Sequence, residues 1–135
     1  MPGIDECLGE AMRLPGARSA AVIDWISGLA LGVAGDAPGG DHEASACEAA
    51  EVARMVAEHG TFAPPEEVAG PGAGGPPSPG IEDVIVTNAD SYHLLRFVGA
   101  AFDSSVFLHL CVGRDEGNLA MARIRLEDIA TRMVL

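Results

Sequence analysis

The sequence predicts an α+β fold in which one five-stranded antiparallel sheet is covered by helices on both faces. Residues 81–111 contain three apolar runs separated by short turn segments, which is typical of an antiparallel meander of three strands. The second and third runs are apolar at nearly every position, so both faces of the sheet must be covered. A hairpin pattern at residues 17–34 adds two strands, and three amphipathic segments supply the helices. The predicted order is α-β-β-α-β-β-β-α, with the first and last helices on one face and the middle helix on the other.

The N-terminal part is predicted to form a helix followed by a hairpin. Residues 2–14 are predicted to be helical because apolar side chains recur at the spacing of one helix face, namely Ile4, Cys7, Leu8, Ala11 and Met12. Strands are expected at residues 17–24 and 29–34, joined by a tight turn in which Gly28 suits a positive φ. Trp25 lies in this turn, and we interpret it as a partly exposed cover over the core rather than as a binding residue.

Residues 42–59 are predicted to form an alanine-rich helix that begins after the capping residue Asp41 and ends at Gly60. Its predicted buried stripe consists of Ala49, Val52, Ala53 and Val56, widened by Met55 and His59. Small side chains dominate this helix and let another backbone approach closely. The helix can therefore pack tightly on a sheet and also on a copy of itself.

Proline and glycine dominate residues 61–80, where no apolar periodicity is visible. We therefore expect a flexible insert there, within a single domain that spans residues 1–135. The meander that follows is expected to place its strands at residues 81–87, 92–98 and 105–112.

The last predicted helix covers residues 116–133. Asp115 and Glu116 lie at its N-terminus, where the helix dipole favours anions, and Asp128 and Arg132 form an i, i+4 pair. Its predicted buried stripe consists of Leu119, Ala122, Leu126, Ile129, Ala130 and Met133.

Composition narrows the class of protein. A chain of 135 residues with 48% apolar residues can bury the core of one globular domain. The formal net charge of −12 disfavours binding to nucleic acid or to an anionic lipid surface. Cys7, Cys47 and Cys111 lack a metal-binding or disulfide spacing, so we interpret them as buried small hydrophobes in a reducing compartment. With neither a signal peptide nor an apolar run of roughly 18 residues, we expect a cytoplasmic protein without membrane insertion.

The common catalytic and metal-binding patterns are missing from the sequence. The chain has no lysine and no phosphate-binding loop, and it lacks the nucleophile elbow of serine hydrolases. His93 and His109 lie on neighbouring predicted strands. With Phe97 paired to Val106, these two histidines point to opposite faces and cannot converge on a metal. We therefore predict no enzyme activity, no cofactor and no metal.

Three segments carry a resemblance to a known family: LPGARSAAVIDWISGLALG at residues 14–32, IEDVIVTNADSYHLLRF at 81–97, and VFLHLCVGRDEGNLAMARIRL at 106–126. With the alanine-rich helix between them, they resemble the Roadblock (dynein light chain seven) family, and most closely its short, stand-alone actinobacterial members. The resemblance covers nearly the whole chain except residues 61–80. It implies the strand order 2-1-5-4-3.

The resemblance also implies a homodimer that pairs through the middle helix and the third strand, here about residues 43–58 and 81–87. Independently, such pairing would cover an exposed strand edge that is otherwise an aggregation hazard. The candidate interface residues are Cys47, Ala50, Glu51, Arg54, Met55, Glu58, Ile81, Asp83 and Ile85. Family members bind or regulate small Ras-like GTPases, and in bacteria they often accompany a GTPase and a sensor kinase. The implied function is therefore that of a non-catalytic dimeric adaptor.

A second hypothesis is a small-molecule-binding sensor module. Tyr92, Arg96 and His109 are its candidate lining residues, because related sandwiches of sheet and helix can hold a ligand against the sheet. The competing interpretation of Arg96 is an ion pair with an acidic residue on a helix.

Overall fold

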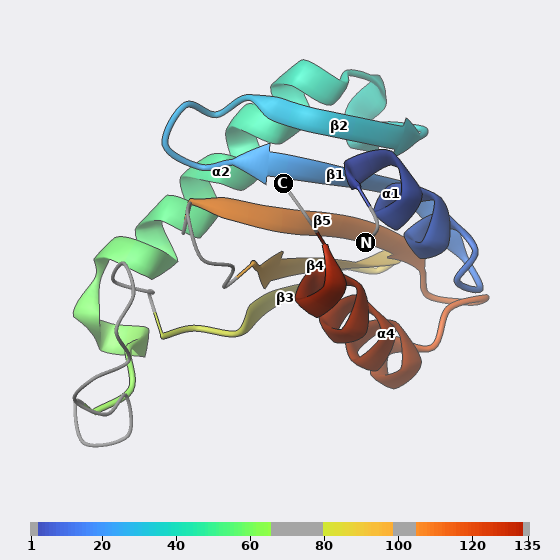
Figure 1. Ribbon diagram of the computed structural model, residues 1–135. Helices are drawn as coiled ribbons and strands as arrows, with labels where there is room; N and C mark the ends of the chain where they lie inside the picture. Colours follow the sequence, from blue (N-terminus) through green and yellow to red (C-terminus); the bar gives the residue numbers. More distant parts are fainter. Residues whose placement is uncertain (1–2, 66–79, 99–104, 134–135) are drawn as a thin grey trace.

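The computed structural model describes residues 3–65, 80–98 and 105–133. Its elements follow the predicted order, and the sheet has the predicted strand order β2-β1-β5-β4-β3, antiparallel throughout (Figure 1). The helices are α1 (Ile4–Met12), α2 (His42–Glu58) and α4 (Leu119–Arg132), and the strands are β1 (Ala17–Asp24), β2 (Ala30–Gly35), β3 (Asp83–Thr87), β4 (Ser91–Phe97) and β5 (Val106–Gly113). The connection at residues 99–104 and most of the expected insert, residues 66–79, lie outside the described residues.

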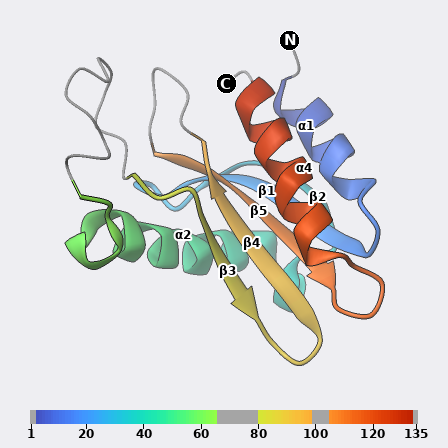
Figure 2. The same cartoon turned by 90° about the horizontal axis from the view of Figure 1, so that it is seen from below.

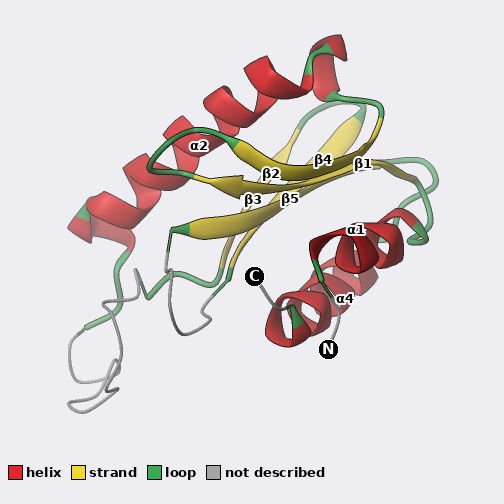
Figure 3. Cartoon of the chain, turned by 45° about the horizontal axis from the view of Figure 1, so that its top comes forward, coloured by secondary structure: helices red, strands yellow, loops and turns green. Residues whose placement is uncertain are grey.

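The helices form two layers on opposite faces of the sheet, as predicted. Helices α1 and α4 lie side by side on one face, and α2 crosses the other face (Figures 2 and 3). Strand β5 is central and buried along its whole length, which agrees with its nearly continuous apolar sequence. None of the helices in the described parts of the chain is both long and apolar enough to cross a membrane.

Two hydrophobic clusters hold these layers together. Beneath α1 and α4, the buried cluster includes Leu8, Val22, Leu94, Leu108 and Leu126. Beneath α2, the second cluster includes Ile23, Trp25, Ala50, Phe97 and Phe107. The cluster under α2 contains the buried aromatic side chains of the described residues, because the alanines of this helix leave room for large residues from the sheet.

The register of β4 against β5 differs by one residue from the predicted register. Phe97 lies opposite Phe107, whereas Val106 was the predicted partner. A shift of one residue moves every side chain of a strand to the other face. The prediction that His93 and His109 point apart was therefore wrong: the two rings lie on the α2 face, with His93 Nδ1 2.9 Å from His109 Nε2.

Trp25 also differs from the prediction. Its side chain is only 7% exposed, and its ring meets Phe97 edge-on with the ring centroids 5.2 Å apart. The residue lies in a turn, but the backbone at that turn folds over the α2 face, so the indole enters the core. Gly28, in the same turn, has the predicted positive φ, here 77°.

The caps of the helices are partly as predicted. Asp41 caps α2 by accepting hydrogen bonds from the backbone N–H groups of Glu43 and Ala44. His59 rather than Gly60 is the C-terminal cap of α2. Helix α4 begins three residues later than predicted, and its cap is Asn118, whose side chain accepts from the Met121 N–H. Residues 115 and 116 therefore precede the helix instead of forming its first turn.

Candidate protein interface

Helix α2 presents two different faces. Its inner face carries Ala46, Ala50 and Ala53, which are at most 2% exposed and let the helix approach the sheet closely. The predicted stripe was right at Ala53 but wrong at Val52 and Met55, which are 41% and 64% exposed. The outer face presents side chains to solvent along its length.

Four of the predicted interface residues share this outer face. Cys47, Glu51, Met55 and Glu58 are all exposed, and their spacing of four, four and three residues places them on one stripe of a helix. The structure thus brings together the predicted α2 candidates with two exceptions. It also shows that Cys47 is exposed, whereas all three cysteines were predicted to be buried.

The two exceptions on α2 are engaged within the chain. Ala50 is 1% exposed and belongs to the cluster beneath the helix, so its side chain is not at the surface. Arg54 is half-buried and donates from Nη1 to the carbonyl oxygen of Trp25 at 3.2 Å, which ties the middle of α2 to the β1–β2 turn.

Strand β3 is one of the two edges of the sheet. Its pairing with β4 is regular over all five residue pairs, from Asp83 to Thr87. Val86 lies on the α2 face and Ile85 on the α1/α4 face, because they lie opposite His93 and Leu94 respectively. They are 45% and 38% exposed, so apolar side chains flank this edge on both faces.

The other predicted residues near β3 are held by contacts within the chain. Ile81 is half-buried against the cluster beneath α2. The Asp83 carboxylate is 11% exposed and forms ion pairs with Arg123 at 2.7 Å and Arg96 at 3.6 Å. Asp83 therefore anchors the start of β3 to α4, and Ile85 is the predicted β3 candidate that remains exposed.

A second apolar surface was not predicted. It lies along β2 and the turn before it, at the opposite edge of the sheet, and consists of Ile26, Leu29, Leu31 and Val33, which are 43–70% exposed. The apolar letters LALGV are the signal that could have revealed it, because a short edge strand cannot bury both of its faces. The register between β1 and β2 is irregular at Val22 and Ile23, and such irregularities disfavour pairing with another strand.

The paired histidines are the chemically distinctive group on the α2 face. His93 Nε2 lies 3.3 Å from Ser91 Oγ and 3.8 Å from Cys111 Sγ, beside a cavity of about 700 Å³. Burial, and then the charge of His93, lowers the pKa of His109 to about 4. Burial also raises the pKa of the Cys111 thiol, which disfavours a reactive thiolate. Within the described ranges, no three His, Cys, Asp or Glu side chains are grouped to hold a metal.

The residues of the ligand-binding hypothesis do not converge. Tyr92 and Arg96 face α1 and α4, whereas His109 faces α2. Arg96 forms ion pairs with Glu127 of α4 at 3.8 Å and with Asp83, which confirms the competing interpretation. The Arg114 guanidinium lies over the Tyr92 ring, 5.5 Å from its centroid.

We compared the sequence and the fold with those of known proteins. No family model and no curated protein sequence matches the chain. A Roadblock/LC7 domain from Streptomyces avermitilis is similar in structure, with a TM-score of 0.68, 17% identity, and coverage of 96% of this chain and 92% of that one. The gliding protein MglB from Thermus thermophilus gives a TM-score of 0.66, 17% identity, and coverage of 94% and 82%. An MglB with a tetrameric arrangement gives a TM-score of 0.66 and 18% identity, with coverage of 94% of this chain and 82% of that one. The chain therefore has the Roadblock fold.

Proposed function

We propose that this protein is a non-catalytic adaptor that acts as a homodimer. In this proposal, the β3 strands of two subunits pair and the outer faces of their α2 helices come together. The composite surface then receives a protein partner, for which a small Ras-like GTPase is the first candidate. The observation that carries the proposal is the regular edge of β3, which among the described residues pairs with β4 alone and is flanked by exposed Ile85 and Val86 beside a solvent-facing α2.

Pairing at β3 has a physical rationale. An edge strand leaves a row of backbone N–H and C=O groups without sheet partners, and a two-fold axis beside β3 would satisfy this row and extend the sheet to ten strands. Pairing about this axis would bury Val86. It would also bury Val52 and Met55 if the two α2 helices meet along their outer faces. The tetrameric arrangement of the similar MglB supports a tendency of this fold to self-associate.

Charge works against this assembly. Helix α2 carries Glu43, Glu48, Glu51 and Glu58 on exposed positions, and each chain carries a net charge of −12. Like charges repel across a two-fold interface, so the apolar contact at Met55 has to exceed that repulsion. We therefore expect the dimer to tighten as ionic strength rises.

Met55→Asp tests the interface. The substitution places a further carboxylate in the proposed contact, so we expect the dimer dissociation constant to rise at least about tenfold. Leu31→Asp is the matched control, because it introduces the same charge at an exposed apolar position on the opposite edge strand. Sedimentation velocity measures both variants. Dissociation caused by Leu31→Asp but not by Met55→Asp would place the dimer at β2 and contradict the proposal.

The partner is tested separately. Purified small Ras-like GTPases from the same organism, loaded with GDP or with a GTP analogue, are titrated into the protein by isothermal calorimetry. We expect one of them to bind the wild-type dimer and to lose affinity for Met55→Asp. Binding that is unchanged in this variant would exclude the α2 surface as the site of contact.

A further inference from the structure

The arginines of this chain are nearly all engaged by other groups of the protein. The chain has eight arginines, and six of them have an ion pair or a hydrogen bond with the rest of the chain. These six are Arg18, Arg54, Arg96, Arg114, Arg123 and Arg132. Among the described residues, no acidic or carbonyl partner is found for Arg13 or Arg125.

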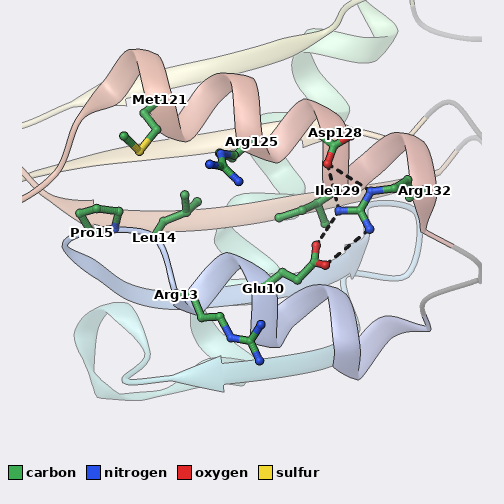
Figure 4. Close-up of a pocket in the computed structure, with 9 residues that line it drawn as sticks. All are labelled: Glu10, Arg13, Leu14, Pro15, Met121, Arg125, Asp128, Ile129 and Arg132. Carbon is green, nitrogen blue, oxygen red and sulfur yellow. Dashed lines mark hydrogen bonds and ion pairs between the residues drawn. The ribbon is translucent and has the colours of Figure 1, made fainter.

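The two unpaired arginines line the same cavity. It lies between α1 and α4 and has a volume of about 310 Å³, with Arg13 on the α1 side and Arg125 on the α4 side (Figure 4). Besides five charged residues, the lining contains four uncharged ones: Leu14, Pro15, Met121 and Ile129. Met121 is 40% exposed, so this apolar lining is open to solvent.

The acidic residues of this cavity are already neutralised. Arg132 Nη2 lies 2.6 Å from Glu10 Oε2 and 3.0 Å from Asp128 Oδ2, so one guanidinium joins the two helices through both carboxylates. The five charged side chains of the lining therefore sum to +1 in a chain whose formal net charge is −12. The Debye length at physiological ionic strength is only about 8 Å, so the distant acidic residues are largely screened from a ligand held here.

We propose that the groove between α1 and α4 binds a short acidic segment of a partner protein, in which carboxylates flank an apolar side chain. Arg13 at the end of α1 and Arg125 on α4 offer guanidinium groups to the carboxylates of such a segment, and Leu14, Met121 and Ile129 suit a leucine-like side chain. An inorganic anion offers nothing to the apolar lining. The groove is on the sheet face opposite to α2, so it remains open in the proposed dimer, and this proposal does not depend on the dimer.

Fluorescence anisotropy of labelled peptides with the full chain tests this proposal. The probe peptide is Asp-Leu-Asp-Glu-Leu-Glu. One control peptide replaces the acids by their amides, and a second replaces the leucines by glycine. We expect the probe to bind more tightly than both controls and to weaken as ionic strength rises. We also expect Arg13→Gln/Arg125→Gln to weaken it about tenfold, since each exposed ion pair is worth a few-fold in affinity.

Arg114→Gln is the control for the arginine variants, because it removes one positive charge from an exposed site in the turn after β5. We expect it to leave binding unchanged, and we expect the Arg13 and Arg125 variants to keep the wild-type melting temperature, since neither arginine has a partner to lose among the described residues. Equal weakening by Arg114→Gln would show general attraction to charge and overturn the proposal. The proposal would also be overturned if either control peptide bound as tightly as the probe, or if inorganic phosphate displaced the probe completely. The same holds if the probe did not bind at low ionic strength.

Discussion

His93 and His109 share a hydrogen bond within the sheet, and this pair makes the folding stability depend on pH. The pKa of His109 is about 4 in the folded chain and about 6.5 when unfolded. Between these values the unfolded chain binds more protons, so the free energy of unfolding rises with pH. The contribution of His109 is complete above pH 6.5 and is lost as the pH falls toward 4. It amounts to at most roughly 3 kcal/mol.

Urea unfolding at a series of pH values between 7 and 4.5 measures this effect. We expect His109→Gln to flatten the pH dependence, because the amide keeps a hydrogen-bonding group but cannot be protonated. His59→Gln changes an exposed histidine at the end of α2 and should keep the wild-type slope. A wild-type slope in His109→Gln would mean that another group controls the pH dependence.

Gly35 and Gly9 provide a second test at single residues. Gly35 has a φ of 76°, and a Cβ added there would lie 2.3 Å from the Arg18 carbonyl oxygen. Gly35→Ala should therefore lower the free energy of unfolding by about 2 kcal/mol or more. Gly9 lies inside α1 with nothing within 4 Å of an added Cβ, so Gly9→Ala should raise that free energy by about 0.5–1 kcal/mol. Thermal or urea unfolding measures the free energy of unfolding of both variants. Equal changes in the two variants would contradict this expectation.

The histidine pair shows why the sequence predicted some residues poorly. Strand β5 is apolar on both faces, so its hydrophobic pattern does not determine the register. The predicted pairing differed by one residue, and that was enough to reverse the faces of β5. The predicted exposure of Trp25 was wrong for a related reason. A residue assigned to a turn is expected near solvent, and only the path of the backbone shows that its side chain enters the core.

The bounds and buried faces of the helices and strands were predicted well where apolar residues are clearly set apart from charged or turn-forming ones. The bounds of β1 were predicted to the residue, because the pair at residues 15–16 ends the preceding helix and a turn segment follows the strand. The buried stripe of α4 was confirmed apart from half-buried Leu119, because apolar and charged residues alternate at helical spacing along it. In α2, alanine occurs on every side of the helix, so several stripes fit the sequence equally well. The sheet selects the stripe with Ala46, Ala50 and Ala53, where the smallest side chains allow the closest approach.

Two neighbouring residues of α2 test which face is buried. Ala53 is fully buried, so Ala53→Leu must displace side chains of the sheet and should cost about 1–3 kcal/mol of folding stability. Val52→Leu adds a single methylene at a position 41% exposed and should change stability by no more than about 0.5 kcal/mol. Chemical denaturation of both variants gives the comparison. A larger cost for Val52→Leu would mean that the helix is rotated relative to this structure.

For the whole molecule, the sheet has two edges of similar apolar character, at β2 and β3. The strand order implied by the family resemblance placed both β2 and β3 at edges, and the apolar run of residues 81–87 favoured pairing at β3. The exposed apolar surface along β2 was not predicted, since β2 reads as half of an ordinary hairpin. What separates the edges is regularity: the β3 register is even, whereas β2 is irregular against β1. We therefore propose self-association at β3, which would leave the groove between α1 and α4 free for a partner segment.

The proposed association of two chains through β3 and α2 can be tested by measuring the mass in solution. Light scattering coupled to size-exclusion chromatography, over a concentration series at moderate ionic strength, measures the mass directly. We expect a species with twice the chain mass of 13.9 kDa that persists on dilution and is lost in Met55→Asp. A mass of one chain at every concentration would contradict it, because the β3 edge would then remain unpaired.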